Sequence, residues 1–191
     1  MPDYTIYKTI DINPGMPFPT HEIRLEMWRL PEDSEYRVGG YQYEISILIT
    51  GQRQADWGIS QVQQIISGLR AGYGCGRWID IDPENPLNLH FADFNNDGYL
   101  DMALRWFPPQ TFGMADDSHY FWLFDPNAPS RDMFQRNHSL EHAASFGQVV
   151  SVADGYIVVF SFHGIMHQYW AAYAYVDGEF VFVRNENVGP D

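Results

Sequence analysis

Oxygen-bearing side chains recur at alternate positions of residues 93–101, a stretch that reads DFNNDGYLD. A loop that folds around a cation points alternate side chains inward, and Ca²⁺ takes about six to eight oxygen ligands. The predicted ligands are the side chains of Asp93, Asn95 and Asp97, the backbone carbonyl of Tyr99, and Asp101 either directly or through water. Gly98 permits a sharp turn at the sixth position, because glycine adopts a positive φ at little cost. The pattern therefore predicts a calcium site.

The flanks of this loop distinguish it from an EF-hand. An EF-hand requires a bidentate glutamate at the twelfth position, where this chain has Leu104. It also requires a helix on each side, whereas residues 89–92 and 100–106 have the composition of strands. We therefore predict a strand–calcium loop–strand unit. The alternative is a metal-free hairpin turn rich in Asn, Asp and Gly, although such a turn needs only one or two of these residues.

The loop and its apolar flanks resemble the FG-GAP type of calcium repeat. Residues 43–183 resemble a family of small exported bacterial β proteins built on a D-x-N-x-D-G-Y-x-D loop, and the similarity includes residues 120–126, Phe134 and the hairpin at 173–180. Some members are related to periplasmic inhibitors of invertebrate-type lysozyme, and some are immunity proteins against secreted lysozyme-like toxins. The resemblance implies a non-enzymatic, calcium-binding protein of the periplasm, the medium or the cell surface, whose partner is a peptidoglycan hydrolase.

The charge of the chain restricts its partners. The formal net charge is −14 at pH 7, and Lys8 is the only lysine. Nucleic acids and anionic membrane surfaces attract clusters of Lys and Arg, so the composition argues against both. A strongly acidic protein attracts basic proteins electrostatically, so we predict a basic protein as the partner. No apolar run reaches the length of a membrane span. Residues 1–3 do not look like a signal peptide, so export would require a leader that has been removed.

The strand pattern predicts a mainly β fold. Aromatic and β-branched segments alternate with turn signals, of which Asp154-Gly155 and Asp177-Gly178 are typical of two-residue hairpins. Residues 59–69 fit both a helix with a capping box and a strand, and the resemblance favours the strand. We predict one antiparallel β domain, a sandwich or a small propeller-like fold, at residues 41–191. Residues 1–40 would form an N-terminal extension packed on it.

Residues 67–73 (SGLRAGY) have the composition of a glycine-flanked loop. Arg70 and Tyr73 could form hydrogen bonds with the catalytic carboxylates of a hydrolase. They are the predicted partner-binding residues.

Two other functions compete with inhibition. Residues 138–142 (HSLEH) match the H-x-x-E-H signature of a zinc peptidase class. That chemistry requires a helix and a third ligand, whereas this segment lies between strands and is a loop in the resembled family. The second alternative is a cell-surface or carbohydrate-binding β module that uses exposed aromatic side chains. We predict that the protein is not an enzyme.

Overall fold

The computed structural model describes residues 2, 4–12, 21–35, 41–55, 58–72, 89–106, 118–144, 147–153, 156–163 and 167–185. These residues form three four-stranded antiparallel sheets, each built from four strands that follow one another in the chain. The predicted mainly β, antiparallel fold is therefore confirmed. In the described part of the chain, no helix has the length and hydrophobicity needed to cross a membrane.

The first sheet contains β1 (Tyr4–Ile10), β2 (His21–Arg29), β3 (Tyr41–Ala55) and β4 (Gly58–Gly72), in that order. Buried and exposed residues alternate along β2, as expected for a strand with one solvated face. Strands β1 and β2 thus belong to the same sheet as β3 and β4. Residues 36–40, where the sequence predicts the division into extension and domain, lie outside the described residues.

The ambiguous segment 59–69 lies within β4, which confirms the strand. Its helix-like spacing has a local cause. The register of β3 and β4 shifts between Ile45 and Ile47, which pair with Leu69 and Ile66 respectively. Gly68 has φ +76° at this irregularity. Strand β4 thus has one residue more than β3 at this point, and this extra residue returns Leu69 to the buried face. The spacing of the apolar residues along β4 therefore departs from a strict period of two and resembles that of a helix.

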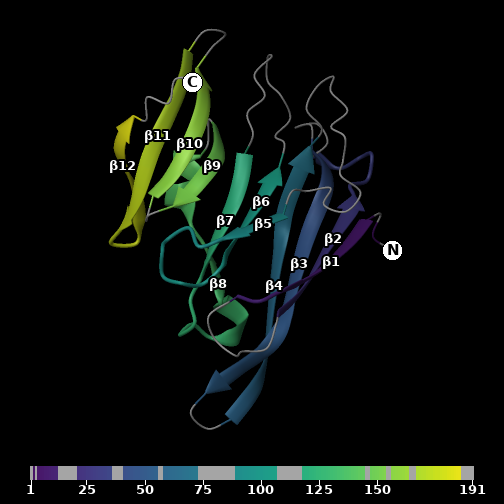
Figure 1. The fold of residues 1–191 in the computed structure, drawn as a ribbon. Helices are drawn as coiled ribbons and strands as arrows, with labels where there is room; N and C mark the ends of the chain where they lie inside the picture. The colour runs from purple at the N-terminus through teal and green to yellow at the C-terminus, as the bar shows by residue number, and fades with distance from the viewer. Residues whose placement is uncertain are drawn as a thin grey trace.

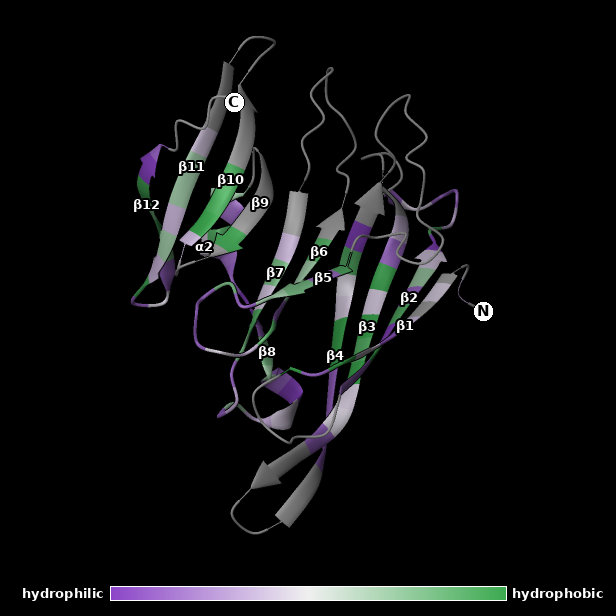
Figure 2. Cartoon of the chain, in the orientation of Figure 1, coloured by the Kyte–Doolittle hydropathy of each residue, from purple (hydrophilic) through white to green (hydrophobic). Residues whose placement is uncertain are grey.

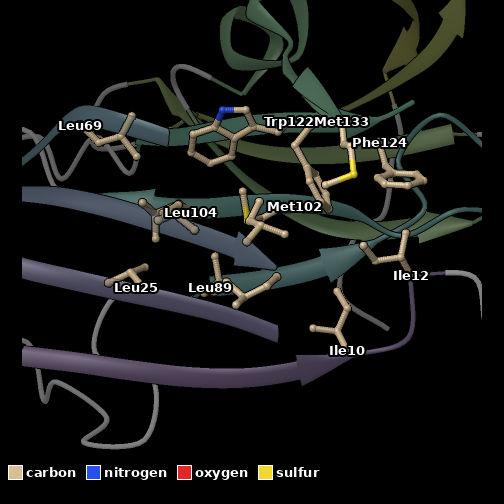
Figure 3. Close-up of a cluster of buried hydrophobic side chains, with 14 of the residues drawn as sticks. Ile10, Ile12, Leu25, Leu69, Leu89, Met102, Leu104, Trp122, Phe124 and Met133 are labelled. Carbon is tan, nitrogen blue, oxygen red and sulfur yellow. The ribbon is translucent and has the colours of Figure 1, made fainter. Parts of the chain in front are cut away.

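The second sheet contains β5 (Leu89–Ala92), β6 (Asp101–Trp106), β7 (Ser118–Phe124) and β8 (Phe134–Arg136). Both of its faces are covered. Along β6, Met102 and Leu104 belong to one buried cluster, whereas Ala103 belongs to another. Figure 3 shows the first cluster, in which side chains of this sheet point toward side chains of the first sheet.

The third sheet contains β9 (Gly147–Ala153), β10 (Tyr156–His163), β11 (His167–Val176) and β12 (Glu179–Asn185). The Asp177-Gly178 hairpin is confirmed, with φ values of 51° and 93° that suit a type I′ turn. Residues 154–155 lie outside the described residues, but Ala153 and Tyr156 pair directly on either side of them.

Two short helices, η1 (Ser130–Asp132) and α2 (His138–Ala143), lie on either side of β8 in the chain. The three sheets form three layers, with β5–β8 between the other two (Figure 1). The first buried cluster fills the space between β1–β4 and β5–β8, and the second lies between β5–β8, α2 and β9–β12. Along the strands, apolar segments alternate with polar ones (Figure 2).

Candidate calcium loop and the adjoining cleft

The candidate calcium loop connects β5 to β6 in the middle layer. Its two ends are held together, because Ala92 pairs with Asp101 in the strand ladder. The loop also contacts the N-terminal segment, since the backbone N–H of Leu100 donates to the carbonyl oxygen of Ile12 at 2.8 Å. The sequence prediction of a strand on each side of the loop is therefore confirmed.

The loop folds around its own side-chain oxygens. The two carboxylate oxygens of Asp93 accept hydrogen bonds from the backbone N–H groups of Asp97 (3.0 Å) and Gly98 (2.9 Å). Asp97 in turn accepts from the N–H of Tyr99 at 2.9 Å. Gly98 has φ +90°, where a residue with a Cβ would be strained. The sequence period and the glycine thus produce a compact turn whose first carboxylate lies inside it.

Asp101 anchors the loop to the middle sheet. Its side chain is fully buried, and its two carboxylate oxygens accept from the N–H groups of Phe94 (2.8 Å) and Phe124 (2.7 Å). Burial raises the pKa of the Asp101 carboxyl to about 7; the two N–H donors act to lower the pKa, and Asp97 and Asp93 raise it further. The geometry therefore gives Asp101 a structural role, and its part as a direct or water-mediated ligand stays a prediction.

The donor types fit calcium. A carboxylate oxygen that accepts one N–H keeps a second lone pair, so the bonds that fold the loop leave donors for a cation. Among the described residues, no three acidic, histidine or cysteine side chains are arranged to hold a metal. This holds for Asp93, Asp97 and Asp101 of the predicted set, which also includes the amide oxygen of Asn95 and the carbonyl oxygen of Tyr99. Calcium binding by the loop therefore stays a prediction. Hard cations accept these neutral oxygens as ligands.

A cleft of about 670 Å³ adjoins the loop. Its lining comes from the loop, from the segment between β7 and β8, and from the β11–β12 hairpin, and it includes Asp97, Tyr99, Asp125, Asn127 and Tyr175. Partial burial raises the pKa of the Tyr175 hydroxyl, with smaller contributions in the same direction from Asp101 and Asp97. The third sheet therefore extends to the loop. The three segments that line the cleft are far apart in the sequence and meet only in the folded protein. Sequence analysis therefore predicted neither the cleft nor the position of Tyr175 in it.

Arg70, one of the two predicted partner-binding residues, lies in a strand and not in the predicted loop. Residues 67–72 are not a loop, because they belong to β4. Arg70 lies opposite Glu44 in the ladder with β3 and already interacts within the protein. Residues 69–72 continue the ladder with β3 past Gly68, so this glycine marks an irregularity in a strand. Tyr73 lies outside the described residues.

The H-x-x-E-H segment is also corrected, since residues 138–143 form helix α2 and not a loop. Asn137 caps this helix by accepting from the N–H of Leu140 at 2.9 Å. Glu141 is already engaged, because Arg136 donates to both of its oxygens, at 2.7 and 3.1 Å. His138 Nδ1 lies 2.9 Å from the same carboxylate. These contacts give Glu141 a structural role in joining α2 to β8.

Sequence analysis also missed a buried histidine. His21 is 7% exposed, and its Nδ1 has no hydrogen-bond partner among the described residues. Its ring packs edge-on against Phe124, with ring centroids 6.3 Å apart. A Cβ at Gly51 would lie 2.5 Å from Cδ2 of His21, so only glycine leaves room for the ring. Burial lowers the pKa of His21, and the charge of Asp11 acts in the opposite direction.

No family model matches this chain, and a search of curated proteins finds no match. A solved structure described as "Structure of a Xanthomonas Type IV Secretion System related protein" is similar, with a TM-score of 0.56 and 15% sequence identity. The similarity covers 96% of this chain and 87% of that one. At this identity it concerns the fold alone.

Proposed function

We propose that this chain is an exported, non-enzymatic calcium-binding protein that inhibits a lysozyme-like peptidoglycan hydrolase. The observation that carries the proposal is the compact loop of residues 93–101, which closes around Asp93 and is tied through Asp101 to two strands of the middle sheet. A cation in this loop would stiffen the middle layer and the cleft beside it. Calcium would thus act indirectly, by fixing the surface that binds the partner.

Charge supports the choice of partner. A net charge of −14 attracts basic proteins over distances longer than a contact. Screening acts over a Debye length of about 8 Å at physiological ionic strength. Association with a basic hydrolase should therefore slow as salt is added, whereas dissociation should depend on a few buried contacts. The name of the similar solved protein, which relates it to a type IV secretion system, agrees with an exported protein.

The test is surface-bound binding kinetics with a basic lysozyme-like peptidoglycan hydrolase, chosen from the neighbouring genes where one of them encodes such an enzyme, at low and high salt, in calcium and in chelator. We expect binding below micromolar concentration, an association rate that falls with salt, and a loss of enzyme activity on binding. Asp97→Ala should weaken the calcium dependence. The matched control is Asp132→Ala, which removes an equally charged side chain from the exposed helix η1. No binding at micromolar concentration in calcium would refute the proposal.

The non-enzymatic part has its own test. The purified protein should cleave neither peptide nor glycan, and Glu141→Gln should change no hydrolytic activity. An activity that disappears in Glu141→Gln would show that the H-x-x-E-H segment is catalytic, contrary to the proposal.

A carbohydrate-binding module is the second candidate, and the cleft beside the loop favours it. Tyr99 and Tyr175 offer aromatic rings, and Asn127 and Gln135 offer amide groups of the kind that bind sugar hydroxyls. A volume of about 670 Å³ falls within the range of roughly 300–1,000 Å³ that small-ligand sites occupy. Binding on a glycan array that Tyr175→Ala abolishes, without binding to any hydrolase, would favour this function over inhibition.

A further inference from the structure

The outer strand of the third sheet, β12, has an unusual surface for an edge strand. Apolar side chains occupy positions 180–183, but only Phe180 is buried. Phe182 is 55% exposed, and Val181 and Val183 are 40% and 41% exposed. Strands with continuous apolar sequence are usually covered on both faces. The sequence of β12 thus suits a strand covered on both faces, whereas Val181, Phe182 and Val183 are exposed. In addition, β12 has a hydrogen-bonded neighbour on one side only among the described strands.

Some of the features that protect edge strands from pairing are missing from β12, although a bulge at Val183 interrupts its ladder with β11. Soluble proteins block such edges with lysine, proline, inward charges or very short strands. Strand β12 runs for seven residues, from Glu179 to Asn185, and has no lysine or proline. Its position at the outside of the sheet is visible in Figure 1. Residues 179–182, which precede the bulge, are therefore the part of this edge that offers a regular template for an added strand.

Acidic groups surround the beginning of β12. Asp177 and Glu179 are exposed beside the turn, and Asp97 and Asp125 line the cleft that reaches Gly178. The surface thus has an apolar centre and an acidic rim at one end, the usual arrangement of a protein interface. Arg184, at the other end of the strand, lies over the ring of Tyr156, 5.2 Å from its centroid.

We propose that an extended segment of the basic hydrolase adds to the edge of β12 with which no described strand pairs, as a fifth strand of the third sheet. This inference rests on the proposed function and names the binding surface for it. Backbone hydrogen bonds would give the segment its register, and Phe182 with Val181 and Val183 would bury apolar side chains of the partner. Basic residues of the segment would lie next to Asp177 and Glu179. A second copy of this chain is disfavoured, because two molecules of charge −14 repel.

The test uses Phe182→Glu and Val181→Glu in the full chain, with the same basic lysozyme-like hydrolase as the probe. Both changes add negative charge, which attracts a basic partner, so charge does not explain weaker binding, whereas loss of the apolar contact does. The matched control is Ile65→Glu, which changes an apolar side chain that is 63% exposed on the first sheet. We expect Phe182→Glu to weaken affinity by about ten- to a hundredfold through faster dissociation, and Ile65→Glu to leave affinity unchanged.

Hydrogen exchange on the wild-type protein is the second measurement. It is needed because Phe182 also contacts Tyr173, so that its replacement removes a contact within the third sheet. Backbone N–H groups of residues 179–185 in the wild-type protein should gain protection when the hydrolase is added. Wild-type binding without this protection, and with full affinity in both β12 variants, would overturn the inference and leave the proposed function intact. Absence of wild-type binding would overturn both. A dimer in light scattering that Phe182→Glu dissociates would show that β12 pairs with a second copy, which would overturn the choice of occupant.

Discussion

Replacing Asp101 by asparagine should loosen the calcium loop at both of its attachments. In the wild-type protein the two carboxylate oxygens accept the N–H groups of Phe94 and Phe124, at 2.8 and 2.7 Å. Asparagine has nearly the same shape but offers one acceptor oxygen and one NH₂ donor. Whichever way the amide turns, one buried N–H then faces another donor.

The cost follows from this count. An unsatisfied buried N–H costs about 1–3 kcal/mol, and bonds to a charged acceptor contribute more than neutral ones. Removal of a buried charge offsets a part of this loss, so we expect a net decrease of about 2 kcal/mol in the free energy of unfolding. For a chain of this size that corresponds to a fall of roughly 4–8 °C in Tm.

The assay is urea unfolding at pH 8 in chelator, followed by tryptophan fluorescence, since Trp122 is buried in the core. The control is Asp125→Asn. Asp125 accepts from the N–H of Asn127 at 2.8 Å in an exposed turn, so water can replace the lost acceptor. We expect this control to lose less than about 1 kcal/mol. Equal losses in the two variants would refute the anchoring role of Asp101.

Three further changes test other parts of the structure. In calcium at a hundred times its dissociation constant, the protein should gain about 2.7 kcal/mol by linkage, and Asp97→Ala should abolish this gain; equal Tm values with and without chelator would count against the site. Burial lowers the pKa of His21 in the folded state below 6.5, so the unfolded chain binds a proton at this residue more readily. The stability that the neutral His21 ring contributes is therefore fully present above pH 6.5 and is lost as the pH falls through 6.5 toward the folded-state pKa. The stability difference between wild type and His21→Phe should therefore shift in favour of the variant between pH 8 and 5, and a constant difference would contradict the burial of a neutral ring. Gly51→Ala should cost about 1–3 kcal/mol because its Cβ would overlap the His21 ring; in a double-mutant cycle His21→Ala should remove most of this cost, and additive effects would show that the overlap is not the cause.

Local sequence was sufficient for the strands, the Asp177-Gly178 hairpin and the strand–loop–strand unit at 89–106. These features depend on interactions between residues close in the chain. Alternation with a period of two assigns each residue to a face, and Asp-Gly suits the positive φ values that a type I′ turn requires. The same local period brings the oxygens of the loop inside the turn. The composition also indicated a β fold, since aromatic and β-branched residues suit a half-buried pleated surface.

The tertiary structure decided what each of these local units contacts. Asp101 looks like any other loop acid in the sequence, but the packing of β7 on β6 buries it and supplies the N–H of Phe124. Tyr175 reaches the cleft beside the loop only because the third sheet packs on the middle one. Residues 180–183 have the sequence of an ordinary core strand, yet β12 is the outermost described strand of its sheet, and three of these residues are exposed. Burial and sheet order depend on residues distant in sequence, so no local pattern encodes them.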